Sequence, residues 1–214
     1  ALFQTKAITR QGRIEDGNTV SDYEPEEVKR GASVQTSLIP CHWNGFKINI
    51  LDTPGYEDFA GEVTSALRVA DSGVIVIAAT SGVGLGTERA WGRCQEAGIP
   101  SLMFINKMDR DNADFFRCVE QAQSIFGRRC IPFQVPIGSQ QQFNGIVDVL
   151  NLPNEIPHQV AFEVQSARER LLEAVAETND TLATKYLEGS DLTDAEILAA
   201  SQKAILNREI VPIF

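Results

Sequence analysis

Apolar and polar positions along the chain follow two periods, one typical of strands and the other of helices. Short apolar runs are each followed by a stretch in which apolar residues recur every three or four positions. The pattern predicts strands over residues 34–43, 46–51, 74–78, 101–105 and 131–135, and helices over residues 63–70, 87–97, 113–126 and 161–177. This alternation favours an α/β fold with a mostly parallel sheet, in which ligands bind at the carboxyl ends of the strands.

The first two strands are separated by two residues, Asn44 and Gly45. This spacing predicts an antiparallel hairpin at the edge of the sheet. Ahead of it, residues 1–11 carry a weak helical pattern and residues 12–27 have the composition of a polar loop. The acidic residues of that loop are expected to be solvated; they are Glu24, Glu26 and Glu27.

The pattern changes from Pro136 onward. Short strand-like pieces and a proline-containing linker come first, followed by the helix over residues 161–177 and a capping box at Thr193–Glu196 that begins another helix. We therefore expect a core over residues 1–136, an inserted α+β subdomain over residues 137–208, and a return strand of the core over residues 209–214.

Composition narrows the class of protein. The 214 residues contain 43% hydrophobic and 22% charged side chains, as in ordinary globular proteins. The net charge of −10 opposes strong direct binding to nucleic acid. Four cysteines without C-x-x-C spacing predict buried free thiols, and the longest apolar run, residues 73–79, is too short to cross a membrane. A cytoplasmic protein with no membrane partner is expected.

A polar motif, Asn106-Lys107-Met108-Asp109, directly follows the strand over residues 101–105. The carboxylate of Asp109 can accept two hydrogen bonds from the N1–H and the exocyclic amine of guanine, while Asn106 offers an amide and Lys107 an aliphatic stem. The plainer alternative is a polar turn before the next helix, which Asp111 or Asn112 is expected to cap.

A second motif, Asp52-Thr53-Pro54-Gly55, directly follows the strand over residues 46–51. Asp52 can hold Mg²⁺ through water, and Gly55 allows a backbone N–H to approach a terminal phosphate closely. A simple turn is again the alternative, because Thr-Pro-Gly is favourable turn chemistry.

The two motifs, in this order and both at strand ends, resemble the GTPase core of translation factors, and the flanking residues are similar to elongation factor G. These flanks are residues 30–33, 52–59, 84–91, 136–138, 143–149 and 185–192. The resemblance implies a P-loop NTPase-like fold with an insertion, GTP or GDP and Mg²⁺ as ligands, GTP hydrolysis, and the ribosome as partner of the full-length protein, in elongation or recycling.

The same resemblance implies roles for individual residues. Asp52, Thr53, Pro54, Gly55 and Tyr56 would lie near the phosphates, with Gly55 and Tyr56 at the reacting group. Asn106, Lys107 and Asp109 would bind the guanine. Ser33 and Asp52 would hold Mg²⁺, since Ser33 stands where the family usually has threonine.

Tyr56 departs from the family pattern, which usually has a histidine that orients the attacking water. A phenol does not act as a base near neutral pH, although it can exchange one hydrogen bond. Tyr56 resembles a divergent branch of elongation factor G-like proteins. Slower or differently triggered hydrolysis is the expectation.

The phosphate-binding loop G-x-x-x-x-G-K-[ST] that the family requires does not occur in these residues. We therefore expect a chain truncated at both ends, which alone binds nucleotide weakly or not at all and is inactive. The alternatives are a degenerate, non-hydrolysing GTPase-fold binding module and a translational GTPase of the ribosomal protection or release-factor type. A doubly wound oxidoreductase is disfavoured because G-x-G-x-x-G is missing after the first strand.

Overall fold

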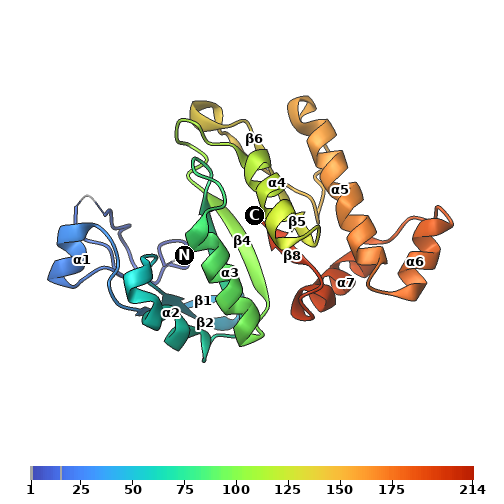
Figure 1. Cartoon of the computed structure of the whole chain (residues 1–214). Helices are drawn as coiled ribbons and strands as arrows, with labels where there is room; N and C mark the ends of the chain where they lie inside the picture. Colours follow the sequence, from blue (N-terminus) through green and yellow to red (C-terminus); the bar gives the residue numbers. More distant parts are fainter. Residues whose placement is uncertain (1, 15) are drawn as a thin grey trace. The chain divides into compact units, whose positions relative to one another are not determined.

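The computed structural model describes residues 2–14 and 16–214 (Figure 1). The described residues form two compact units, one up to Ala70 and the other from Asp71 onward. The boundary between the units at residues 70 and 71 differs from the expected division at residues 136 and 208. That division into core and insertion stays a prediction. The α/β class is confirmed, since a parallel sheet with helices is accompanied by antiparallel strand pairs.

The first unit contains a two-stranded antiparallel sheet of β1 (Ser37–Trp43) and β2 (Phe46–Asp52). Trp43 pairs with Phe46, so that Asn44 and Gly45 alone form the turn. Both turn residues have positive φ, 48° and 82°, as a two-residue hairpin turn requires. The predicted hairpin is confirmed.

Helices of the first unit differ in part from those that the pattern predicts. Residues 2–10 form turns and bends, so the helix expected over residues 1–11 is wrong for the residues described. The polar loop instead ends in a short helix, α1 (Pro25–Arg30), with Pro25 in its first turn and Gly31 at its carboxyl end in the left-handed conformation. The 3₁₀ turn η1 (Glu57–Phe59) and α2 (Ala60–Leu67) follow β2.

The second unit is built on a four-stranded parallel sheet in the order β3-β4-β8-β5. Its strands are β3 (Gly73–Ala78), β4 (Ser101–Asn106), β5 (Cys130–Pro132) and β8 (Val211–Ile213). Helices α3 (Leu85–Ala97) and α4 (Phe115–Phe126) pack side by side on this sheet, where the rings of Trp91 and Phe126 lie 4.9 Å apart. Asp114 caps α4 by accepting a hydrogen bond from the N–H of Arg117, so the expectation that Asp111 or Asn112 caps it is wrong.

A further part of the second unit follows β5. The strand expected over residues 131–135 is two strands, β5 and β6 (Gln134–Ile137), and β6 pairs antiparallel with β7 (Gly145–Asp148). The 3₁₀ turn η2 (Gln140–Gln142) lies between β6 and β7, and the 3₁₀ turn η3 (His158–Val160) lies between β7 and the helices that follow. These helices are α5 (Ala161–Ala176), α6 (Asp180–Leu187) and α7 (Asp194–Leu206). The capping box of Thr193 and Glu196 at the start of α7 is confirmed.

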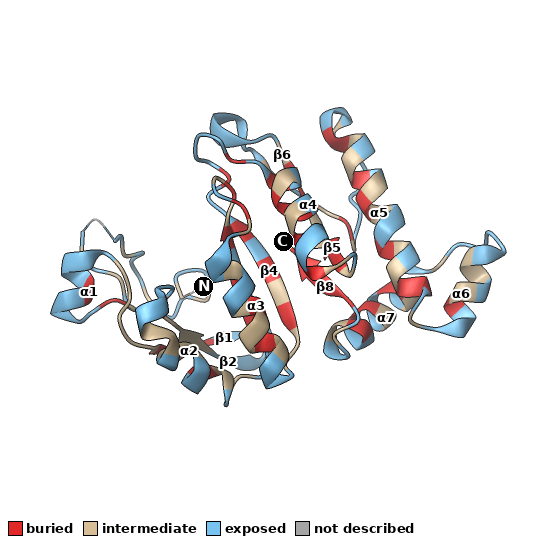
Figure 2. Ribbon diagram, in the orientation of Figure 1, coloured by how far each residue is buried: buried red, intermediate tan, exposed pale blue. Residues whose placement is uncertain are grey.

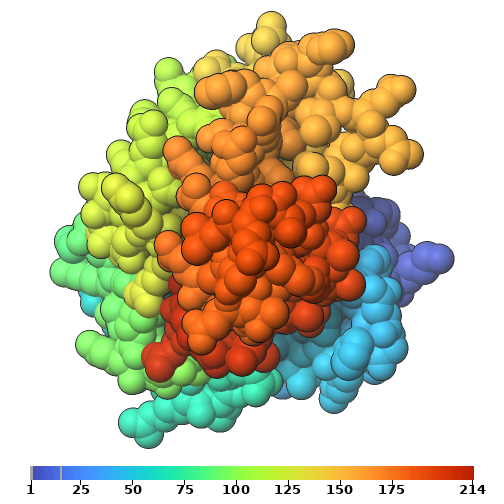
Figure 3. All heavy atoms as spheres, turned by 90° about the vertical axis from the view of Figure 1, so that its right-hand side faces the viewer, coloured from blue at the N-terminus to red at the C-terminus, as the bar shows by residue number. Residues whose placement is uncertain are grey.

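The part of the second unit that follows β5 is held together by buried apolar side chains (Figure 2). The apolar faces of β5, β6 and β7 form one core with side chains from α5 and α7, including Val164, Leu171 and Ile197. In the space-filling view, the residues of α5 to α7 gather on the face turned toward the viewer, coloured orange to red (Figure 3). All four cysteines are buried and unpaired, which confirms the expected free thiols. No helix among the described residues is both long and apolar enough to cross a membrane.

Candidate functional site

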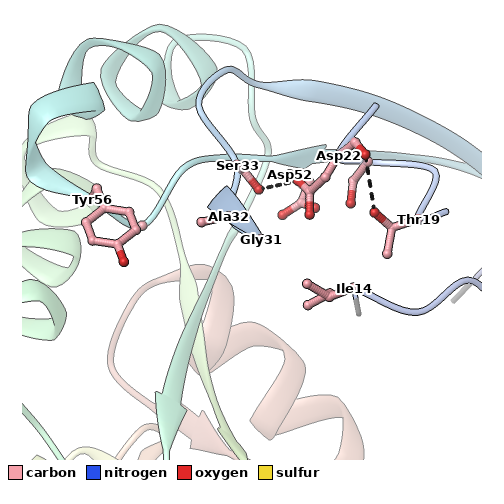
Figure 4. A pocket seen from close by; sticks show the side chains of 10 residues that line it. Ile14, Thr19, Asp22, Gly31, Ala32, Ser33, Asp52 and Tyr56 are labelled. Carbon is pink, nitrogen blue, oxygen red and sulfur yellow. Dashed lines mark hydrogen bonds between the residues drawn. The ribbon is translucent and has the colours of Figure 1, made fainter. Parts of the chain in front are cut away.

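A pocket of about 500 Å³ opens in the first unit beside the carboxyl end of β2 (Figure 4). Four residues with a predicted site role line it: Ser33, Asp52, Gly55 and Tyr56. Six further residues complete the lining: Ile14, Thr19, Ser21, Asp22, Gly31 and Ala32. The pocket therefore joins the loop that follows β2 to the polar segment on both sides of α1.

Oxygen atoms of side chains from three segments meet in this pocket. The hydroxyl of Ser33 donates to Oδ1 of Asp22 at 2.7 Å, and the hydroxyl of Thr19 donates to the backbone carbonyl of Asp22 at 3.5 Å. Asp22 is only 9% exposed. Figure 4 shows the carboxylates of Asp22 and Asp52 beside the Ser33 hydroxyl, with the Tyr56 ring apart from them.

The electrostatics of the pocket favour a cation. Burial raises the pKa of Asp52, a hydrogen bond from the Ser21 side chain lowers it, and the negative charges of Asp22 and Glu27 raise it further. The net effect is an Asp52 pKa above the ordinary value of 3.8. A carboxylate that is costly to ionise for these reasons gains from a neighbouring positive charge.

The donor set fits Mg²⁺ in particular. Carboxylate and hydroxyl oxygens are hard ligands, and Mg²⁺ is usually held by one or two carboxylates while water and substrate phosphates complete its shell. In the part of the chain that the structure describes, no group of three or more His, Cys, Asp or Glu side chains could hold a metal by itself. Asp52 and Ser33 could therefore supply part of a Mg²⁺ shell, with water and a ligand needed for the rest.

The segment that carries Ser33 is fixed by a buried carboxylate. Glu27 of α1 is 0% exposed, and its Oε1 accepts hydrogen bonds from the backbone N–H groups of Val34 at 2.9 Å and Gln35 at 3.2 Å. Its Oε2 accepts from the N–H of Glu24 at 3.2 Å. The expectation that Glu27 is solvated is therefore wrong, because these amide groups replace water around the carboxylate.

The residues of the loop after β2 differ in their exposure to solvent. Gly55 is exposed, and no atom lies within 4 Å of where a Cβ at this position would be, so space is open beside its backbone. Tyr56 is 64% exposed. Pro54 is buried and Thr53 half-buried, and neither lines the pocket. Of this motif, Asp52, Gly55 and Tyr56 reach the pocket.

The second motif lies in the second unit, at the carboxyl end of β4. Lys107 adopts a left-handed conformation with φ of 64°, and its N–H donates to Oδ1 of Asn106 at 2.8 Å. Met108 is buried and its carbonyl accepts from the N–H of Gln140 at 2.8 Å, whereas the side chain of Asp109 is 70% exposed. Met108 therefore anchors the loop while Asn106, Lys107 and Asp109 face outward.

The carboxylate of Asp109 lies near the guanidinium of Arg110, with Nε 3.9 Å from Oδ2. Such an exposed contact at the limit of ion-pair distance is weak, so it leaves the Asp109 oxygens accessible to hydrogen-bond donors of a ligand. That both motifs bind one nucleotide stays a prediction.

Sequence reasoning did not include Ser21 and Asp22 in the site. Both lie in the polar loop ahead of α1, where no periodic pattern marks inward-facing side chains. The signal that could have found them is the helix of six residues that begins at Pro25 and ends before Gly31, because such a helix gives the preceding loop a fixed path.

Comparison with known proteins identifies the family of this chain. The sequence profile of the "Elongation factor Tu GTP binding domain" family matches residues 1–209. Elongation factor G of Thermotoga petrophila is 37% identical over 226 aligned residues, covering 99% of this chain and 32% of that protein. Elongation factor G of Thermotoga maritima is 36% identical over 216 residues, covering 94% of this chain and 31% of that protein.

A crystal structure of a protein from Thermus thermophilus superimposes with a TM-score of 0.90 at 33% identity, covering 99% of this chain and 34% of that one. The profile, the relatives and the fold together define a GTP-binding domain of the translation-factor class. The chain belongs to the elongation factor Tu GTP-binding domain family, and within it is similar to elongation factor G. It spans about a third of the length of these relatives (32% and 31%).

Proposed function

We propose that this chain is the nucleotide-binding part of a GTPase that binds GTP and GDP with Mg²⁺ and hydrolyses GTP in ribosome-linked translation, during elongation or recycling. The observation that carries the proposal is the pocket in which Ser33 and Asp52 bring oxygen ligands together beside the open backbone of Gly55. The outward-facing Asp109, which suits guanine, supports it independently.

Each residue has a task that its chemistry suits. Asp52 and the hydroxyl of Ser33 would hold Mg²⁺, which when bound neutralises charge on the phosphate oxygens. The N–H of Gly55 would approach the terminal phosphate, and the Tyr56 hydroxyl would lie near the water that attacks it. Asn106 and Asp109 would bind the edge of the guanine, and the stem of Lys107 would cover its face.

The setting of this function is proposed as well. We place the protein in the cytoplasm, with the ribosome as partner of the full-length protein. The net charge of −10 means that contacts to ribosomal RNA would come from other parts of that protein. A degenerate, non-hydrolysing module is less well supported, because such a scaffold needs neither the oxygen-lined pocket nor a carboxylate suited to guanine.

Asp52→Asn tests the cation site of the full-length protein. The Mg²⁺ concentration that half-saturates binding of fluorescent GDP is expected to rise by about tenfold or more, since loss of one carboxylate near a metal typically weakens its binding 10–100-fold. Asp58→Asn, which changes an exposed carboxylate of η1 on the same loop, is the matched control and should leave the midpoint unchanged. Equal midpoints in the parent and Asp52→Asn would remove Asp52 from the cation site.

Tyr56→His tests the role of the tyrosine. Ribosome-stimulated GTP turnover of the full-length protein is expected to rise, because an imidazole can orient the attacking water and accept a proton near neutral pH, which a phenol does poorly. Tyr23→His, an exposed tyrosine of the same unit outside the pocket lining, serves as control. An unchanged or reduced rate for Tyr56→His would count against the proposed difference in hydrolysis.

A further inference from the structure

Three carboxylates hold four consecutive residues of the segment that carries Ser33. Asp22 accepts from the Ser33 hydroxyl, and Glu27 accepts from the N–H groups of residues 34 and 35. Oε2 of Glu62 accepts from the N–H of Thr36 at 2.8 Å. Side-chain carboxylates thus hold residues 33–36, which lie between α1 and β1 and belong to no helix or strand.

Glu62 differs from the other two carboxylates in where it comes from. Asp22 and Glu27 precede Ser33 closely in the chain, whereas Glu62 is 26 residues beyond Thr36, on α2. Between β2 and α2 lie only the loop of Gly55 and Tyr56 and the turn η1. The hydrogen bond to Glu62 therefore joins the two segments of the pocket that carry Ser33 and Gly55.

The path from one segment to the other is short and continuous. The N–H of Phe59 donates to the carbonyl of Tyr56 at 3.0 Å, and η1 runs directly into α2, which begins at Ala60. Glu62 is therefore in the first turn of a helix whose start is tied to Tyr56. A displacement of Gly55 and Tyr56 that moves η1 moves the acceptor of the Thr36 N–H with it.

We propose that Glu62 is a positioning residue that couples the Ser33 segment to the loop of Gly55 and Tyr56, so that a ligand ordering one of them orders the other. Glu62 acts through the backbone of Thr36 and does not line the pocket. The Thr36 N–H holds the pKa of the Glu62 carboxyl below its ordinary value, consistent with a charge-assisted bond. The coupling is a property of the free protein; only the identity of the ligand rests on the proposed function.

Amide hydrogen exchange of the full-length protein without nucleotide gives the first test. In Glu62→Ala, exchange of the Thr36 N–H is expected to accelerate about tenfold, as for the loss of a charged acceptor. Glu62→Gln keeps an acceptor oxygen without the charge and should give an intermediate rate. Ser65→Ala, an exposed position on α2, is the matched control and should leave Thr36 unchanged. Unchanged exchange at Thr36 in Glu62→Ala would overturn the proposal.

A double-mutant cycle tests whether Glu62 couples the Ser33 segment to residues 57–67 or only holds the N–H of Thr36. Ser33→Ala removes the bond to Asp22 and is expected to accelerate exchange over residues 57–67 about threefold in the parent, because the loosened segment releases Glu62. In a Glu62→Ala background the same change should have no effect on residues 57–67. Equal effects of Ser33→Ala in both backgrounds, or none in the parent, would overturn the coupling. No nucleotide is needed, so a failure of the proposed GTPase function would leave this result interpretable.

Discussion

Replacing Asp109 with asparagine is expected to lower the affinity of the full-length protein for GDP at least about a hundredfold, since two hydrogen bonds to a charged acceptor are lost together. Affinity for xanthosine diphosphate should rise at the same time. Xanthine has a carbonyl where guanine has its exocyclic amine, so the asparagine amide can donate to it where a carboxylate would be repelled. Titrations with fluorescent GDP and xanthosine diphosphate measure both changes.

The matched control for this exchange is Asp111→Asn, which makes the same chemical change at an exposed position two residues away. It should leave both affinities unchanged, because one carboxylate accepts from both the N1–H and the exocyclic amine of guanine. If Asp109→Asn binds both nucleotides as the parent does, the assignment of this loop to guanine is wrong, whatever the pocket of the first unit binds.

Glu27→Ala is expected to destabilise the first unit by about 3 kcal/mol, because three backbone N–H groups lose their acceptor and the loop they belong to cannot easily return all of them to water. The N–H groups concerned belong to Glu24, Val34 and Gln35. Urea unfolding followed by the fluorescence of Trp43, in a Trp91→Phe background, reports on this unit, since Trp43 lies in β1.

The control for this stability change is Glu26→Ala on the same helix. Glu26 is exposed and forms an ion pair with Arg30 one turn later, at 2.7 Å. Exposed pairs of this kind contribute at most about 0.5 kcal/mol. A loss of stability of similar size in the two variants would show that the buried Glu27 contributes no more to the free energy of unfolding than the exposed Glu26 does.

The dependence of this stability on pH has a definite sign. Burial raises the pKa of Glu27, and hydrogen bonds from the backbone lower it. The lowering is the larger effect, so the pKa in the folded protein lies below the ordinary value of 4.5. The contribution of Glu27 is therefore fully present above pH 4.5 and is lost as the pH falls through the lowered value. The difference in stability between the parent and Glu27→Ala should shrink over that acidic range.

The sequence pattern predicted most of the secondary structure, because local signals and packing agree there. The Asn44-Gly45 turn specified the hairpin, and the apolar face of residues 113–126 specified α4. The break between β5 and β6 could not be predicted. The N–H of Phe133 donates to Ile213 while its carbonyl accepts from Val149, so the chain exchanges one partner strand for another there. A continuous apolar run contains no sign of that exchange.

Some residues of the candidate site could likewise be predicted from the sequence, and others could not. Motifs that directly follow a strand indicated Asp52 and Gly55, because the end of a strand fixes where such residues lie. Asp22 and Glu27 were missed or misplaced because a carboxylate becomes buried only when hydrogen-bond donors from elsewhere in the chain surround it; for Asp22 the donor is the Ser33 hydroxyl. For Glu27 these come from Val34 and Gln35, and residue type alone does not reveal them.

The position of β8 between β4 and β5 has a consequence for how the chain folds as it is made. Ile213 pairs with Met103 on one side and with Pro132 on the other, so these two strands gain their common neighbour only after more than a hundred residues beyond β4 have been added. A growing chain on the ribosome therefore carries β4 and β5 with unpaired edges until synthesis reaches Ile213. Contacts between parts so distant in the chain form slowly, and edges left open in the meantime favour aggregation, so completion of the sheet is the step at which chaperone assistance would have the greatest effect.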